Sequence, residues 1–199
     1  MKTQVEPNHY FNESYNSKER FISYWHQINE IIKLNPKRVL EIGIGNRFIS
    51  KYLKERRINI ITLDIDKRLN PDVVGSVLDI PFANEYFDIV IQFTVFTSVL
   101  KKEMKGDIAK EMLRVLKKEG IILWYDFSYD NPKNPDVKGI KKKEIIDLFP
   151  NCEFNFNRVT LAPPLVRFIA PRSWLLCYLF EKLSFLCTHY LVIIRKEKL

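Results

Sequence analysis

The stretch "VLEIGIGNRF", residues 39–48, decides the expected fold. A short apolar strand closes with an acid, Gly43 and Gly45 follow, and a helical pattern begins. Glycines let a backbone turn tightly and approach a ligand closely, so this arrangement is typical of a nucleotide-binding turn. The dinucleotide fingerprints are incomplete, because Arg47 or Phe48 stands where a third glycine belongs. The stretch alone therefore leaves the ligand open.

The composition is that of one globular domain. The chain has 199 residues, of which 46% are hydrophobic and 28% charged, and this suits a single sizeable core. No run approaches the roughly 18 uncharged apolar residues of a membrane-spanning helix. The N-terminus lacks the apolar centre of a secretory signal. We therefore expect a cytoplasmic protein.

The charged and metal-binding residue types point to no particular partner. The formal net charge of +8 is spread over short runs, which solvated helix faces explain better than a nucleic-acid or membrane partner. The three cysteines and three histidines share no ligand spacing. Neither a disulfide framework nor a metal site is therefore expected.

Apolar periodicity predicts alternating helices and strands. Such alternation favours a parallel sheet with helices on both faces. Gly120 follows one amphipathic helix and is predicted to be its left-handed cap. The expected helices span residues 18–34, 48–57, 106–118 and 141–149, and the expected strands span 38–43, 58–66, 72–77, 86–93, 121–127, 152–161 and 189–196.

The segment 163–186, between the last two strands, is rich in large apolar residues. We expect a helix that fills one face of the sheet. The alternative is a substrate cap or a membrane-surface contact flanked by Arg167 and Arg172. Its apolar side would consist of Leu165, Phe168, Ile169, Trp174, Leu175 and Phe180.

Ligands of such sheets bind beyond the carboxyl ends of the strands. Asp64 closes the second strand, where an acid can accept hydrogen bonds from both hydroxyls of a ribose. Glu41 closes the first strand, where a carboxylate is costly unless it is paired. A pyrophosphate would be repelled by Glu41, whereas a ligand that carries an ammonium and a sulfonium would be attracted.

Four motifs in order resemble the class I S-adenosylmethionine-dependent methyltransferases. They are "VLEIGIG", "ITLDID", "GSVLDIPFANEYFDIVI" and "EMLRVLKKEGIILWYDF", and they cover about residues 37–127. The resemblance implies a Rossmann-like α/β fold with a seven-stranded, mostly parallel sheet in the order 3-2-1-4-5-7-6. It also implies methyl transfer from S-adenosylmethionine (SAM), with S-adenosylhomocysteine as product.

The same resemblance assigns the methionine and ribose ends of the cofactor. Glu41, Gly43 and Gly45 would line the methionine end. Asp64 would hold the ribose diol. These are the positions at which the first two motifs match the family.

The adenine and methyl ends are assigned to residues of the second and third motifs and to the residue that follows the third. Ile65 would pack on the adenine, and Val77 would contribute its backbone. Ser76 replaces the acid that relatives present to the adenine amino group, and nearby Asp79 is expected to compensate. Gln92 would face the methionine or the transferable methyl group.

The resemblance implies one methyltransferase domain over residues 1–199, in three parts. Residues 1–35 would form a lid and helix, 36–130 the cofactor-binding core, and 131–199 the substrate side. The segment 9–16 resembles the lid of relatives. Its aromatic residues Tyr10, Phe11 and Tyr15 would close over the cofactor.

The expected acceptor is a small molecule, and no nucleic acid is expected. The tail from residue 123 resembles a subgroup associated with polysaccharide assembly, which favours a sugar or lipid-linked glycan. Asp126, at the end of a strand, is the candidate general base. A nucleic-acid methyltransferase and a non-catalytic cofactor-binding module remain as alternatives, the latter because of Arg47 and Ser76.

Overall fold

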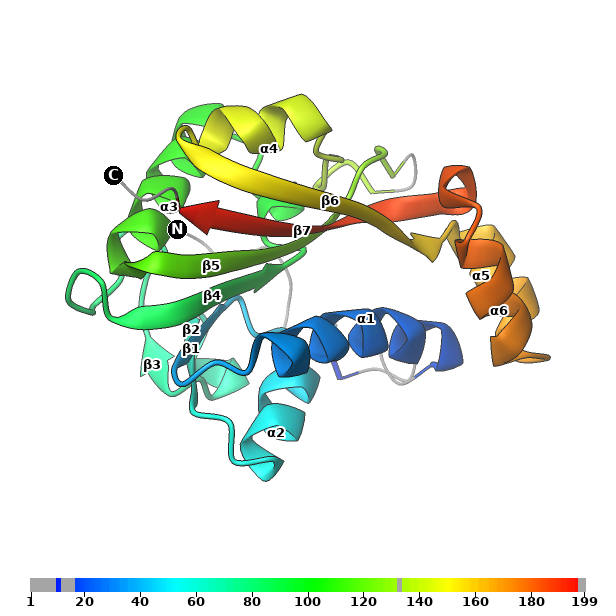
Figure 1. Cartoon of the computed structure of the whole chain (residues 1–199), viewed down its shortest axis with the longest axis horizontal. Helices are drawn as coiled ribbons and strands as arrows, with labels where there is room; N and C mark the ends of the chain where they lie inside the picture. The colour runs from blue at the N-terminus through cyan, green and yellow to red at the C-terminus, as the bar shows by residue number, and fades with distance from the viewer. Residues whose placement is uncertain (1–9, 12–16, 132–133, 197–199) are drawn as a thin grey trace.

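A seven-stranded sheet forms the centre of the computed structural model, which describes residues 10–11, 17–131 and 134–196 (Figure 1). Strands β1 to β5 run parallel, and β7 lies antiparallel between β5 and β6. The order β3-β2-β1-β4-β5-β7-β6 confirms the prediction. The strands are β1 (Val39–Ile42), β2 (Ile60–Asp64), β3 (Val73–Val74), β4 (Phe87–Phe93), β5 (Leu116–Phe127), β6 (Cys152–Leu161) and β7 (Cys187–Lys196).

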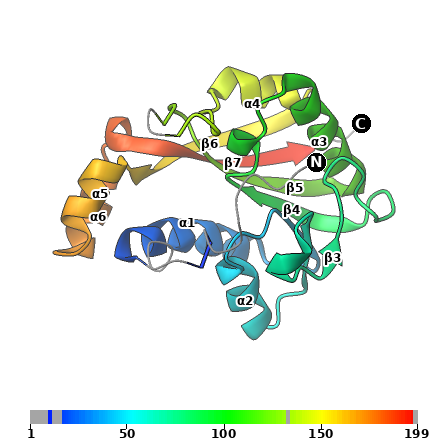
Figure 2. The same cartoon turned by 180° about the vertical axis from the view of Figure 1, so that it is seen from behind.

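Helices cover both faces of the sheet, as Figures 1 and 2 show from opposite sides. α1 and α2 pack on one face, and α3 and α4 pack on the other. The predicted α/β layering is thereby confirmed. The helices are α1 (Lys18–Leu34), α2 (Phe48–Glu55), α3 (Lys102–Val115), α4 (Lys142–Leu148), α5 (Pro163–Ile169) and α6 (Trp174–Glu181), with short 3-10 turns η3 (Lys67–Leu69), η4 (Phe96–Ser98) and η5 (Ser184–Leu186).

The pleat of the strands divides the core into two clusters, because successive side chains point to opposite faces. Leu40 packs in the cluster beneath α3 and α4, whereas Val39 packs beneath α1 and α2. By the same alternation, Glu41 lies on the α1–α2 face. Gln92 and Asp126 lie on the α3–α4 face. The alternation of the strands alone therefore places the polar residues at the strand ends on opposite faces of the sheet.

α1 has the predicted bounds, but part of its apolar pattern is not buried. Ile28 and Ile31 are buried against the sheet. Trp25 is 61% exposed and Ile32 is 44% exposed. The helix ends at Asn35, which adopts a left-handed conformation (φ 44°) and donates its N–H to the Ile32 carbonyl.

The prediction that Gly120 caps a helix was wrong. α3 ends at Val115, and the chain passes directly into β5, so that Gly120 lies inside a strand and has no positive φ. The register explains the difference, because Leu116 already pairs with Phe87 of β4 and pairing resumes only at Ile121. Pairing with β4 therefore ends the helix earlier than the sequence pattern indicates.

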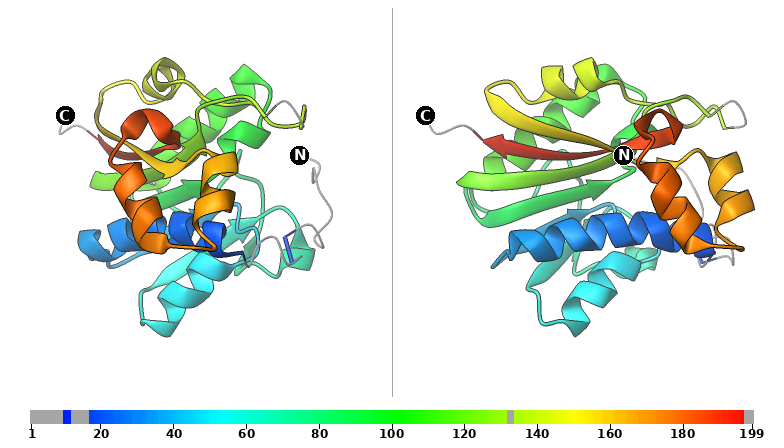
Figure 3. Two further views of the ribbon diagram at one scale, coloured as in Figure 1. Left: turned by 90° about the vertical axis from the view of Figure 1, so that its right-hand side faces the viewer. Right: turned by 45° about the vertical axis from the view of Figure 1, so that its right-hand side comes forward.

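The prediction that segment 163–186 fills one face of the sheet was also wrong. α5 and α6 lie beyond the end of the sheet, as the two views of Figure 3 show. They connect β6 to β7 beyond the pair Leu161–Cys187. Cys187 begins β7 and precedes His189, which pairs with Phe127 at the end of β5, so the connection lies past the end of β5. A small separate cluster attaches them, formed by Ile22, Leu161, Val166, Ala170, Cys177 and Cys187.

Candidate active site

The carboxyl ends of the central strands meet at one edge of the sheet. Ile42, the last residue of β1, pairs with Leu63 of β2 and with Gln92 of β4. Strand order reverses on either side of β1, and ligands of open parallel sheets bind at such a point. The residues that follow β1, β2, β3 and β4 therefore form the candidate site.

The turn after β1 depends on left-handed backbone. Gly43 and Gly45 have φ of 71° and 50°, and Arg47 has φ of 63°. A Cβ on Gly43 would lie 2.5 Å from Val95 Cγ2, so both conformation and space require glycine there. The Phe48 N–H donates to Asn46 Oδ1 (3.1 Å) as α2 begins. The expected glycine turn is present, and Arg47 occupies a conformation that favours glycine.

Asp64 connects this turn to the loop after β2. Its Oδ2 accepts the Ile44 N–H (3.0 Å), and its Oδ1 accepts the Asp66 N–H (2.9 Å). Its carbonyl accepts the Gly75 N–H (3.0 Å) from the end of β3. Each carboxylate oxygen can accept two hydrogen bonds. Asp64 therefore orders both neighbouring loops and retains acceptor capacity for a ligand.

The residues expected near the adenine differ in accessibility. Ile65 and Ser76 are half-buried, and Ser76 Oγ accepts the Leu78 N–H (3.1 Å). The side chain of Val77 is buried in the core, which leaves its backbone for contact. Asp79 is exposed. The pKa of Arg114 on α3 is raised mainly by its hydrogen bond to Glu111, and the negative charge of Asp79 raises it further. Asp79 is therefore close enough to α3 to interact with Arg114 electrostatically.

Glu41 carries an unsatisfied buried carboxylate. The residue is 4% exposed, and no described residue donates a hydrogen bond to its Oε2. Burial raises the pKa of its carboxyl to about 8, which a hydrogen bond with Ser50 opposes. A buried polar atom without a partner is unusual in a native protein and marks a position for a ligand group. A cation at this point would satisfy it.

Gln92 and Asp126 form a buried pair on the opposite face. Gln92 Nε2 donates to Asp126 Oδ2 (2.9 Å), and Gln92 Oε1 accepts the Val95 N–H (3.2 Å). The Thr97 N–H lies 3.4 Å from Asp126 Oδ1. Burial raises the pKa of Asp126 to about 7, against the effect of the hydrogen bonds from Gln92 and Thr97. Both side chains are thus used within the protein to hold the loop after β4.

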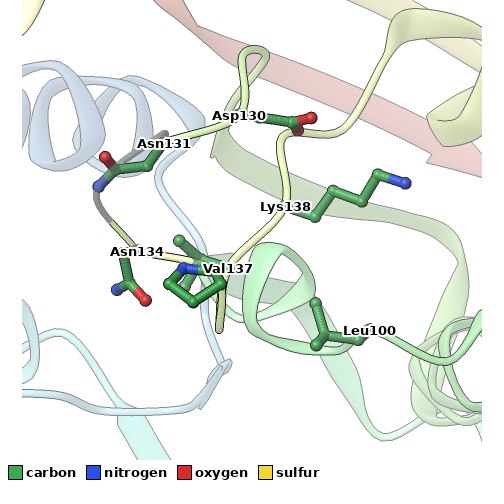
Figure 4. A pocket seen from close by; sticks show the side chains of 7 residues that line it. Leu100, Asp130, Asn131, Asn134, Val137 and Lys138 are labelled. Atoms are coloured by element: carbon green, nitrogen blue, oxygen red, sulfur yellow. The ribbon is translucent and has the colours of Figure 1, made fainter.

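A pocket of about 400 Å³ opens beside this loop (Figure 4). The Lys138 N–H donates to the Thr97 carbonyl (2.8 Å), and Asp130 Oδ1 accepts the Gly139 N–H (2.9 Å). The first bond fastens the loop after β5 to η4 and thereby to Asp126, and the second joins two parts of that loop. The lining residues are Leu100, Asp130, Asn131, Asn134, Pro135, Val137 and Lys138.

Comparison with known proteins identifies the family. A family model described as a methyltransferase domain matches residues 40–124. An uncharacterized methyltransferase of Staphylococcus carnosus is 30% identical over 152 residues, which cover 72% of this chain and 68% of that protein. The chain belongs to the class I SAM-dependent methyltransferases.

Solved structures agree on the fold of this methyltransferase. A SAM-dependent methyltransferase from Archaeoglobus fulgidus superposes with a TM-score of 0.64 at 17% identity, over 94% of this chain and 98% of that one. A protein from Pyrococcus horikoshii superposes with a TM-score of 0.67 at 14% identity, over 97% and 100% of the two chains. SAM is accordingly the cofactor of the family, and S-adenosylhomocysteine is the product.

The strand ends of the methyltransferase fit SAM. The Glu41 Oε2 atom, which has no described donor, suits an ammonium group. At Gly43 there is no space for a Cβ, because it would lie 2.5 Å from Val95 Cγ2. Tyr10, one of the predicted lid residues, lies 3.6 Å from the Cβ position of Gly45. Phe11 is exposed, and Tyr15 lies outside the described residues.

Some residues of the site were missed by sequence reasoning. Val95 packs on Gly43, and Thr97 joins Asp126 to the pocket loop. Leu100 lines the pocket. All three follow β4, and their position after the last residue of a central strand is the signal that would have indicated them.

We expect the substitution Arg47→Gly to stabilise the methyltransferase. A left-handed conformation costs a non-glycine residue roughly 1–2 kcal/mol, so the free energy of unfolding in urea should rise by about 1 kcal/mol. Lys51→Gly, in the regular part of α2, is the matched control and should lower it by about 1 kcal/mol. A loss of stability in Arg47→Gly would mean that its side chain makes a contact that outweighs the strain.

We expect Glu41 to make the stability of the unliganded protein fall with pH. An unfolded carboxyl deprotonates near its ordinary pKa of 4.5, whereas the folded one keeps its proton to about 8. The folded state therefore binds the extra proton, and between pH 5 and 8 the free energy of unfolding should fall by roughly 3 kcal/mol. Glu41→Gln should remove most of this fall. Glu55→Gln, at an exposed position, should leave it unchanged, and an equal slope in both variants would refute the assignment.

Proposed function

We propose that this methyltransferase methylates a hydroxyl group of a small molecule of the sugar or lipid-linked glycan class. The observation that supports this is the pocket beside the loop after β4. Its lining offers the carboxylate of Asp130, the amides of Asn131 and Asn134, and the ammonium of Lys138. Such groups donate and accept hydrogen bonds with hydroxyls, and about 400 Å³ suits a small acceptor.

In this proposal, each of the three parts of the chain has a separate role. Residues 36–130 bind SAM, and residues 131–199 form the acceptor side. The described part of residues 1–35 would cover the glycine turn, since Tyr10 lies next to Gly45 and Asn46 Nδ2 donates to the Tyr24 hydroxyl (3.0 Å). The closeness of both tyrosines to the turn supports a covering role.

Bound SAM would supply an electrophilic methyl group: an acceptor oxygen would bond to the methyl carbon as the carbon–sulfur bond breaks, with its electron pair left on sulfur and the acceptor proton passed to water. Glu41 would hold the ammonium of the methionine end, next to Gly43 and Gly45. Asp64 would accept hydrogen bonds from the ribose hydroxyls. Ile65, Ser76 and Val77 would contact the adenine. Asp79 is exposed beside α3, so its predicted compensation for Ser76 has no contact to support it.

Asp126 acts in this proposal as a positioning residue. It is 1% exposed, and its carboxylate already accepts bonds from Gln92 and Thr97. A general base must come within about 3 Å of the proton that it takes, and this burial favours positioning over the role of base. Gln92 in turn holds the Val95 N–H rather than facing the methyl group with a free amide. The pair sets the loop that separates the SAM site from the acceptor pocket.

We expect Asp64→Ala to weaken SAM binding by at least about 30-fold, because hydrogen bonds to a charged acceptor contribute about 1.5–3 kcal/mol. Isothermal titration with SAM and S-adenosylhomocysteine measures this. Asp66→Ala removes a neighbouring carboxylate that pairs with Arg68, and it should keep affinity within about threefold. Equal losses in both variants would indicate a general disturbance of the loop rather than ribose contact. SAM binding without transfer to any acceptor would favour the non-catalytic alternative.

We expect Leu100→Trp to block the acceptor pocket, since the larger ring fills space beside Lys138. Transfer of a labelled methyl group from SAM to a panel of glycosides, nucleotide sugars and polyprenyl-linked sugars should fall at least about tenfold. SAM affinity should not change. Ile146→Trp, on the exposed side of α4, is the matched control. Methylation of RNA in place of every sugar in the panel would contradict the proposed acceptor class.

A further inference from the structure

The connection between β6 and β7 carries most of the exposed large apolar side chains. Ten of the seventeen such residues in the described chain fall within residues 165–185. Isolated exposed apolar residues are normal, whereas a contiguous patch marks an interaction site. We call these ten exposed residues of one connection the α5–α6 surface; they are Leu165, Phe168, Trp174, Leu175, Leu176, Tyr178, Leu179, Phe180, Leu183 and Phe185.

Packing of the two helices onto the protein does not explain these residues. Val166 of α5, the following Ala170 and Cys177 of α6 already form the attachment to Ile22 of α1. In α6, Cys177 is the buried residue, and the remaining apolar side chains point outward. A helix that is apolar all round is normally enclosed. Here the outward side is left without cover by any described element (Figures 1 and 3).

The exposed charges of the α5–α6 surface are positive. Arg167, Arg172 and Lys182 are exposed. The Arg172 guanidinium lies 4.3 Å from the Phe168 ring centre, and Lys182 Nζ lies 4.6 Å from that of Tyr178.

The acid of this segment is turned inward. The side chain of Glu181 is 9% exposed, and its Oε2 lies 2.9 Å from His26 Nε2 of α1. Apolar and aromatic residues bordered by cations are the composition of elements that lie in a lipid headgroup region.

The surface lies at the same edge of the sheet as the candidate active site. β7 leaves η5 at Cys187 and runs antiparallel to β5, whose last residue, Phe127, pairs with His189. The connection α5–α6–η5 therefore projects past the carboxyl end of β5. No helix among the described residues is long and apolar enough to cross a membrane, so contact with a bilayer would be at its surface.

We propose that the α5–α6 surface docks on an anionic lipid bilayer. The apolar side chains enter the boundary between headgroups and acyl chains, while Arg167, Arg172 and Lys182 contact lipid phosphates. The positive charge selects an anionic bilayer over a second copy of the chain, whose identical cations would face these. The inference goes beyond the proposed function and does not depend on the identity of the acceptor.

Flotation of the full chain with vesicles tests the proposal, without SAM or acceptor. The wild type should bind vesicles of equal parts phosphatidylcholine and phosphatidylglycerol at low salt, and bind phosphatidylcholine alone at least about tenfold more weakly. The double variant Leu175→Glu/Leu179→Glu should lose at least about tenfold in binding to the anionic vesicles. Ile146→Glu places the same charge at an exposed apolar site on α4 and should bind as the wild type does.

The charged residues give a second, independent arm. The triple variant Arg167→Ala/Arg172→Ala/Lys182→Ala should lose on the order of a hundredfold in binding to the anionic vesicles, at about fivefold for each cation near the surface. Its apolar side chains are unchanged, so any residual binding should lose its dependence on salt.

The proposal is overturned if the wild type does not bind anionic vesicles, or if the Leu175→Glu/Leu179→Glu variant binds them as well as the wild type does. If the wild type does not bind vesicles but forms a dimer in light scattering that this variant dissociates, a second copy of the chain is the occupant of the surface. Because no donor or acceptor is present, either result leaves the proposed methyl transfer intact. Conversely, loss of SAM binding leaves vesicle binding intact.

Discussion

The buried hydrogen bond between Gln92 and Asp126 joins the two halves of the site. It spans the ends of β4 and β5, and through Val95 and Thr97 it sets the loop that packs on Gly43 and supports the pocket wall at Lys138. A half-satisfied polar network in a core is worse than an apolar one. Here each end of the Gln92 amide and both Asp126 oxygens have partners. The glycine turn and the pocket therefore keep one relative geometry.

The two faces of the sheet hold their buried carboxylates differently. Asp126 has its hydrogen bonds within the protein, whereas Glu41 retains an oxygen with no described donor. Burial raises the pKa of both groups. A carboxylate that remains unsatisfied in the free protein opposes folding and favours a cationic ligand. The unsatisfied Glu41 lowers the folding stability of the free protein. A cationic ligand that satisfies it would recover this free energy on binding, as is usual for sites that trade stability for function.

The sequence predicted the layers and the position of the glycine turn, because apolar periods and strand-end residues carry that information. The strand order was predicted only by the resemblance of four motifs to the methyltransferase family. It did not predict what tertiary contacts decide. Gly120 resembles a helix cap, but pairing of Leu116 with β4 ends α3 earlier. The apolar run of α6 indicates burial, yet its connection leaves the sheet where nothing described covers it. Val95 and Thr97 carry no motif, so their contacts are visible only in three dimensions.

Residues 24–26 of α1 contact both the glycine turn and α6. The Tyr24 hydroxyl accepts a hydrogen bond from Asn46, and His26, two residues later, forms a hydrogen bond with Glu181 at the end of α6. Two residues correspond to about 200° around a helix, so these contacts leave α1 on opposite sides. A displacement of this part of α1 would therefore alter both hydrogen bonds. By thermodynamic reciprocity, a ligand at the glycine turn that displaced α1 would change the affinity of the proposed α6 docking for a bilayer, and docking would change the affinity for that ligand by the same factor.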